Sequence, residues 1–230
     1  MFGFRSKEKC VTVMLLAVIM ASGASVLQAQ STRRQRRESN VNRQARIART
    51  IEDTYSHRWE VGGGGGYLRY RSGEGLQRNN EVSFWMSGTR YLNPKLGIVA
   101  DVRGSYGKAK ISPYNEFLKF NPQISEYTFL AGPSYRFYAK EKTAVSVFAV
   151  GGVGLGKFDG ASKNIPSSLL GTWPSGYRPA FSVGVNLDYN LYPNLAARFT
   201  PTYVGTTFGG TIQNNAGFNV GLVYRFGRNK

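Results

Sequence analysis

The sequence predicts an all-β fold, an eight-stranded antiparallel up-and-down transmembrane β-barrel, from three observations. From Trp59 onward, about eight segments of about ten residues alternate between apolar and polar side chains, and no helical stripe interrupts them. Tight turns alternate with long polar loops, as expected of a meander with one plain end and one elaborated end. Phe, Tyr and Trp flank the apolar faces, as in the aromatic girdles that contact lipid.

The N-terminus predicts a secretory signal peptide over residues 1–29. Basic residues from Arg5 to Lys9 precede the apolar run Val11 to Ala21, which is too short to span a bilayer, and cleavage is expected after Ala29. The alternative is an uncleaved anchor. The only cysteine, Cys10, precedes the apolar run, so the mature chain would have neither disulfides nor thiolate chemistry.

A basic segment, residues 30–56, follows the signal and is poor in large apolar side chains. We expect a periplasmic tail that is mostly disordered alone, with a short helix possible around residues 42–53. The whole chain carries 30 Lys and Arg against 13 Asp and Glu, a formal net charge of +17. This balance favours anionic partners such as lipid head groups, nucleic acid or acidic polymers, and in an exported protein nucleic acid is not expected.

The first strand contains five consecutive glycines, Gly62 to Gly66, in "RWEVGGGGGYLRY". A flexible linker is the alternative, but the alternation of the flanking aromatic and aliphatic residues continues through the run. Glycine in a small barrel relieves a sharply bent wall and a scarce interior volume. We therefore place the run in the middle of a strand.

The later strands are assigned from their alternation, which leaves only the second, Glu81 to Leu92, without a clear apolar face. Its Trp85 and Tyr91 share one parity, while Phe84 and Met86 share the other. The predicted lipid-facing residues of the clearest strands are Leu96, Ile98, Ala100 and Val102; Tyr127, Phe129, Ala131, Tyr135 and Phe137; Phe181, Val183, Val185, Leu187 and Tyr189; Leu195, Ala197, Phe199 and Tyr203; and Phe218, Val220, Leu222, Tyr224 and Phe226. A fifth segment spans about residues 144–158.

Three prolines lie inside or at the edge of these strands. A closed barrel has no free edge for them, so we expect a bulge or register break near Pro133 and Pro201, and a strand start near Pro179.

The connections predict the topology. The expected tight turns are Asn93 to Lys95, Ala139 to Lys142 and Tyr192 to Asn194, and the long loops are Arg71 to Asn80, Lys108 to Ser125, Asp159 to Gly176 and Gly209 to Ala216. With an even strand count, both termini would be periplasmic and the long loops would face outward.

The region from Trp59 to Phe226 resembles the small outer-membrane β-barrels typified by the transmembrane domain of outer membrane protein A. The resemblance rests on the eight-strand meander, on "LGIVADVRGSYG" and on the closing "GFNVGLVYRF". It implies a multi-pass protein of the cell outer membrane, reached by export with cleavage of the signal peptide. It also implies recognition of Tyr224 and Phe226 by the barrel-insertion machinery, although "GRNK" follows Phe226 here.

Charged residues of inward parity predict a lumen plugged by ion pairs. They are three acids and four bases: Glu60, Asp101, Arg103, Arg136, Asp188, Arg198 and Arg225. Eight strands leave an interior that side chains can fill. A narrow porin-like channel is the alternative, and a soluble periplasmic ligand-binding barrel is a further one.

No catalytic residue, cofactor or metal site is predicted. "GGVGLGKF" matches seven positions of a phosphate-binding loop, but Phe158 replaces the Ser or Thr that holds magnesium, and no helix is expected to follow. The only histidine, His57, precedes the first strand, so the outer rim has no histidine base and no zinc site of several histidines can form.

The expected role is structural or interactive: envelope integrity, adhesion or contact with lipopolysaccharide. Lys108, Lys110 and Lys157 lie nearest the outer strand ends and are the predicted lipopolysaccharide contacts. The expected partners are therefore outer-membrane lipid and the insertion machinery, and we expect a monomer.

Overall fold

The computed structural model describes residues 40–111, 121–160 and 165–228. The chain divides into two units, Met1–Arg46 and Ile47–Lys230, and the barrel lies in the second. The predicted signal peptide, its cleavage after Ala29 and the first part of the tail lie outside the described residues.

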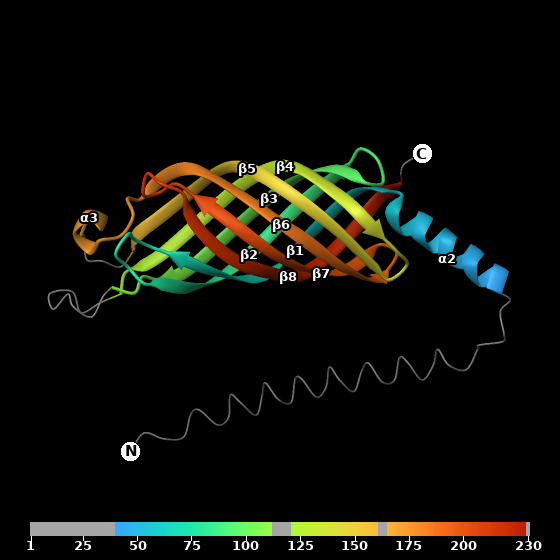
Figure 1. Cartoon of the computed structure of the whole chain (residues 1–230), viewed down its shortest axis with the longest axis horizontal. Helices are drawn as coiled ribbons and strands as arrows, with labels where there is room; N and C mark the ends of the chain where they lie inside the picture. The colour runs from blue at the N-terminus through green and yellow to red at the C-terminus, as the bar shows by residue number, and fades with distance from the viewer. Residues whose placement is uncertain (1–39, 112–120, 161–164, 229–230) are drawn as a thin grey trace, which may run out of the picture. The chain divides into compact units, whose positions relative to one another are not determined.

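Eight strands pair in sequence order and close into an antiparallel barrel (Figure 1), as predicted. They are β1 (His57–Arg71), β2 (Arg78–Tyr91), β3 (Leu96–Lys108), β4 (Gln123–Ala139), β5 (Thr143–Gly160), β6 (Gly176–Tyr192), β7 (Leu195–Thr206) and β8 (Gln213–Arg228). Two helices are described, α2 (Asn40–Tyr55) and the short α3 (Ser167–Leu170). The strands have 12 to 18 residues, longer than the ten expected, because the pairing continues into segments whose polar residues had indicated loops.

The two ends of the barrel differ. At one end, called the turn end below, three tight turns join β2 to β3, β4 to β5 and β6 to β7. At the other end, the loop end, the chain makes its four longer connections, one of which carries α3 (Figure 1). β1 starts and β8 ends at the turn end, where His57 pairs with Arg228.

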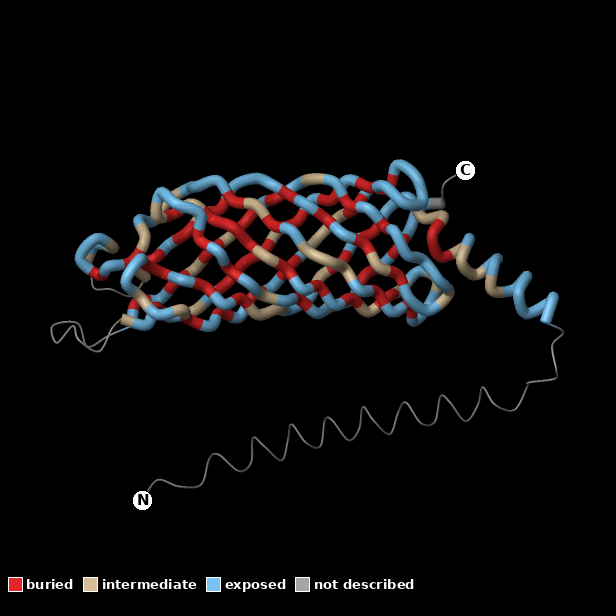
Figure 2. Tube along the Cα trace, viewed as in Figure 1, coloured by how far each residue is buried: buried red, intermediate tan, exposed pale blue. Residues whose placement is uncertain are grey.

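Burial alternates along the strands, which appears as the succession of buried and exposed segments in Figure 2. Large apolar side chains of outward parity are exposed, among them Val82, Met86, Ile98, Phe129, Phe137, Val220 and Leu222. The second strand is resolved by this pattern: Phe84 and Met86 face outward, while Trp85 and Tyr91 are buried in the lumen. An apolar exterior on a closed barrel is the arrangement that satisfies every ladder hydrogen bond inside lipid.

The glycine run lies in the middle of β1, as predicted, and it makes room for Trp85. A Cβ atom on Gly62 would lie 2.9 Å from Cη2 of Trp85 and 3.0 Å from a methyl group of Val223. A Cβ atom on Gly64 would lie 2.1 Å from the backbone oxygen of Val220 on β8. The run therefore allows a bulky inward ring on β2 and a close approach of β1 to β8.

The prolines disturb the ladder less than expected. The registers on both sides of Pro133 and of Pro201 agree, so the predicted bulge or break at these residues is wrong. Each keeps a partner on one neighbouring strand, Ile98 for Pro133 and Phe218 for Pro201, and the ladder is interrupted on the other side only. The register shift in this part of β4 lies instead between Arg136 and Tyr138, and Pro179 lies near the start of β6, as expected.

Helix α2 ends directly before β1. It spans Asn40–Tyr55, so these residues of the tail are helical where a mostly disordered segment was expected, and Thr54 and Tyr55 are buried. Within residues 40–111, 121–160 and 165–228, no helix is long and apolar enough to cross a membrane.

Candidate functional site

The lumen near the turn end holds a network of ion pairs around Glu60. This carboxylate, 2 % exposed, contacts Arg136 and Arg225 at 3.1 Å each and also pairs with Arg198. Asp188 pairs with Arg198 at 2.6 Å and with Arg225 at 3.1 Å. Two acids and three bases from five strands are thereby joined into one buried network.

Aromatic rings pack against the arginines of this network. The guanidinium of Arg136 lies 4.2 Å from the centre of the Tyr91 ring and 4.9 Å from that of Tyr55, and it donates a 2.6 Å hydrogen bond to the Tyr91 hydroxyl. Arg225 lies 5.5 Å from the Tyr55 ring. Cation–π contacts in desolvated sites stabilise such charges.

Tyr55, the last residue of α2, covers the network at the turn end. Its hydroxyl donates to the backbone oxygen of Lys140 at 2.7 Å and accepts from Nδ2 of Asn190 at 2.8 Å. Burial raises the pKa of the Tyr55 hydroxyl, so it remains a hydrogen-bond donor. The end of α2 is thus attached to the turn end of the barrel.

A second, separate ion pair lies nearer mid-height. Arg103 donates to Asp101 at 2.6 Å, to Thr202 at 3.0 Å and to Ser182 at 3.2 Å. These bonds hold the Arg103 guanidinium beside β6 and β7.

Between Arg103 and the loop end, the described residues place two acids and no Lys or Arg in the lumen. Glu81 and Glu126 are buried, at 0 % and 2 % exposure. Within the described residues, neither forms an ion pair; Oε1 of Glu81 accepts from Asn79 at 2.8 Å, and both carboxylate oxygens of Glu126 lack a hydrogen-bond partner.

The loop end itself is closed by an apolar cluster. Phe158 stacks on Tyr70 and meets Phe208 edge to face, with ring centres 6.1 Å and 5.0 Å apart. The buried members of the cluster are Leu68, Tyr70, Ala109, Ile124, Phe158, Val204 and Phe208, and Leu76 and Trp173 pack against it.

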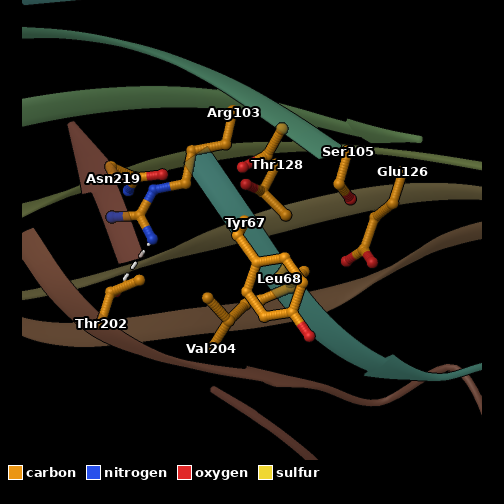
Figure 3. Close-up of a pocket in the computed structure, with 10 residues that line it drawn as sticks. Tyr67, Leu68, Arg103, Ser105, Glu126, Thr128, Thr202, Val204 and Asn219 are labelled. Carbon is orange, nitrogen blue, oxygen red and sulfur yellow. Dashed lines mark hydrogen bonds between the residues drawn. The ribbon is translucent and has the colours of Figure 1, made fainter. Parts of the chain in front are cut away.

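The space beside Arg103, between the two ends, is small. Two cavities of about 20 Å³ each flank Arg103, one lined by Glu126, Ser105 and Thr128 (Figure 3) and the other by Trp85 and Arg198. Each volume suits about one water molecule. Neither of these two cavities has room for a solute larger than water, and the described residues include no group of three or more metal-ligating His, Cys, Asp or Glu side chains.

The sequence-predicted residues fall into three groups in the structure. The lumen charges form two clusters, with Glu60, Arg136, Asp188, Arg198 and Arg225 in one and Asp101 and Arg103 in the other. The lysines Lys108, Lys110 and Lys157 are exposed at the loop end. Tyr224 and Phe226 face outward on β8, with stacked rings 6.1 Å apart.

Sequence reasoning missed Glu81, Glu126 and Tyr55. The expected balance of three inward acids against four bases is wrong, because Glu81 and Glu126 raise the number of acids to five. Glu126 shares the inward parity of Thr128, so its position in the lumen could have been predicted from the sequence. Glu81 lies on the strand for which the alternation does not show which face is inward. Nothing in the sequence places Tyr55 against residues 85 positions later in the chain.

Comparison with known proteins shows likeness in structure only. No family model matches the chain, and no curated protein sequence matches it. Neisserial surface protein A is 15 % identical over 73 % of this chain and 97 % of its own, with a TM-score of 0.50. OprG of Pseudomonas aeruginosa is 11 % identical over 75 % and 97 %, with a TM-score of 0.51, and Ail of Yersinia pestis is 18 % identical over 74 % and 99 %, with a TM-score of 0.49.

The likeness to Neisserial surface protein A and to OprG agrees with the closed barrel. The chain has the fold of the small eight-stranded β-barrels of the bacterial outer membrane.

Proposed function

We propose that this protein is a non-enzymatic outer-membrane barrel with a plugged lumen, which serves the envelope through its wall and its outer loops. The observation that carries the proposal is that the lumen is filled at both ends. The Glu60 network and Tyr55 occupy the turn end, and the cluster around Tyr70 and Phe158 occupies the loop end. A structural or interactive role needs no aqueous path.

The short turns are periplasmic in this proposal and the longer loops face outward, as in outer-membrane barrels generally. Lys108 ends β3, Lys110 bridges to Gln77 beside the first loop, and Lys157 faces outward near the end of β5. Three exposed cations at one rim match the anionic phosphates of lipopolysaccharide, and their attraction acts over about 8–10 Å in physiological salt.

The plugged lumen is tested by single-channel recording in planar bilayers, with a known porin as positive control. The purified protein should give no regular conductance steps. Regular steps at neutral pH would favour the narrow channel instead. A protein that stays in solution without detergent would favour the soluble ligand-binding barrel, which the exposed Phe, Val and Leu side chains oppose.

The lipopolysaccharide contact is tested by replacing Lys108, Lys110 and Lys157 together by glutamine. A matched control replaces the turn-end lysines Lys95, Lys140 and Lys142, so that the net charge changes equally. Co-purifying lipopolysaccharide should fall for the loop-end variant only. Equal retention by both variants would mean that these lysines only solvate the rim.

Barrel insertion is proposed to depend on Tyr224 and Phe226. Their exposed aromatic rings form the last outward pair of β8, and the chain continues beyond them. Replacing both by serine should reduce the amount of folded barrel in the membrane without changing its refolding in detergent.

A further inference from the structure

Unsatisfied polar atoms concentrate at one place in the lumen. Of the described residues, six buried side-chain nitrogen or oxygen atoms lack a hydrogen-bond partner, and five of the six are oxygens between mid-height and the loop end. They are Oη of Tyr70, Oε2 of Glu81, Oε1 and Oε2 of Glu126, and Oγ1 of Thr128. Buried polar groups are normally paired, so this concentration requires an explanation.

The strand register brings these oxygens together. Glu126 on β4 pairs with Ser105 on β3, and two residues further along β3 lies Gly107. A Cβ atom on Gly107 would lie 2.7 Å from Cγ of Glu81, so the Glu81 side chain lies over this glycine. Glu81 and Glu126 lie close enough to repel each other electrostatically, and the Ser105 hydroxyl lies next to Glu81.

Among the described residues, no Lys or Arg forms an ion pair with either acid, and the neighbour of the Glu126 carboxylate is the neutral Tyr70 hydroxyl. The one arginine that lines the same cavity, Arg103, is bonded to Asp101, Ser182 and Thr202. Figure 3 shows its guanidinium beside Thr202, on the far side of the cavity from the Glu126 carboxylate. Two buried carboxylates without a counter-ion are costly, and a bound cation would remove that cost.

A cavity with room for one ion lies beside the Glu126 carboxylate. Its volume is about 20 Å³, and Ser105 and Thr128 also line it, while Glu81 lies outside this lining, next to Ser105. Two carboxylates with hydroxyl oxygens suit a hard divalent cation. Calcium accepts six to eight oxygens in flexible geometry. Magnesium requires a near-ideal octahedron and keeps several bound waters, and a cavity of about 20 Å³ has no room for those waters.

We propose that Glu81 and Glu126 bind one calcium ion inside the barrel, with the hydroxyls of Ser105 and Thr128 completing the protein ligands. The ion neutralises both carboxylates and joins β2, β3 and β4 on the turn-end side of the apolar cluster. Because that cluster seals the loop end, the ion is taken up during folding and exchanges slowly afterwards.

The test uses full-length barrel refolded from denaturant in detergent, free of lipopolysaccharide, in buffer with either CaCl₂ or EDTA. After removal of free ions, metal analysis should find about one calcium per chain in the wild type refolded with CaCl₂. Glu126→Gln should retain none and Glu81→Gln should bind at least about tenfold more weakly. Glu74→Gln, which removes an exposed acid of the first loop, is the matched control and should bind as the wild type does.

A second readout separates metal binding from misfolding. The unfolding temperature of the wild type should rise by about 5–10 °C on refolding with CaCl₂ rather than EDTA, whereas that of Glu126→Gln should not respond. Equimolar MgCl₂ should not reproduce the rise. A wild type that retains no calcium, or equal retention by Glu126→Gln and Glu74→Gln, would overturn the proposal and indicate protonated carboxyls in its place.

Discussion

Replacing Glu60 by glutamine should destabilise the barrel more than any other single neutralisation in the lumen. Glu60 forms three ion pairs, Asp188 forms two and Asp101 forms one. The Glu60 network contains two acids and three bases, a net charge of +1. Glu60→Gln leaves three buried arginines with Asp188 alone, and the net charge becomes +2.

The magnitude follows from the burial of the partners. The side chains of Glu60, Arg136 and Arg225 are each 2 % exposed, so water cannot replace the lost carboxylate. Removing one partner of a buried pair costs about 3–5 kcal/mol. With a urea dependence of about 2 kcal/mol/M, the unfolding midpoint should fall by about 1.5–2.5 M.

The assay is equilibrium unfolding in urea with lipid vesicles, comparing Glu60→Gln, Asp188→Asn, Asp101→Asn and the exposed control Glu74→Gln. The loss of stability should decrease in that order, and Glu74→Gln should change little. Raising the salt concentration should not alter the order, because buried pairs are weakly screened.

A double-mutant cycle tests the reasoning directly. In the described part of the chain, the only ion pair of Arg136 is with Glu60. Arg136→Gln should therefore cost less in the Glu60→Gln background than in the wild type, by about 1–3 kcal/mol. Additive effects, or equal midpoints for Glu60→Gln and Glu74→Gln, would refute the network as a unit.

Three further predictions concern the wall, the cap and the topology. Gly62→Ala should destabilise by about 1–3 kcal/mol in the same assay, because its Cβ would press on the Trp85 ring, whereas Gly63→Ala, whose nearest contact is 3.4 Å, should be tolerated. Burial raises the pKa of Tyr55 above 10.0, so the stability that its neutral hydroxyl adds is present below pH 10 and is lost as the pH rises through the raised pKa. The melting temperature of the wild type should therefore exceed that of Tyr55→Phe by less at high pH than at neutral pH, and an unchanged difference would contradict this. Trypsin on intact cells should cut near Lys110 and spare the turn-end Lys95, and cleavage at Lys95 first would invert the topology.

The sequence by itself determined the barrel, because the wall is a local property. Strict alternation along β6 and β8 requires only that one face meets lipid and the other meets the lumen. The tight turns and longer loops followed from the lengths of the polar stretches between the alternating segments. The inward parity of Glu60, Asp188 and Arg198 was likewise available from single strands.

Only the closed structure decided which side chains meet inside. On β2, apolar residues occupy both parities, so alternation does not show which of them face the lumen. Trp85 faces inward because Gly62 on β1 leaves room for its ring, and this contact joins two strands. That choice fixes Glu81 as inward and so creates the acidic end of the lumen. Tyr55 reaches its partners at Lys140 and Asn190 because the barrel closes at the turn end. Pairing across a lumen depends on strand register and closure, which bring together residues far apart in the chain, and alternation carries no information about either.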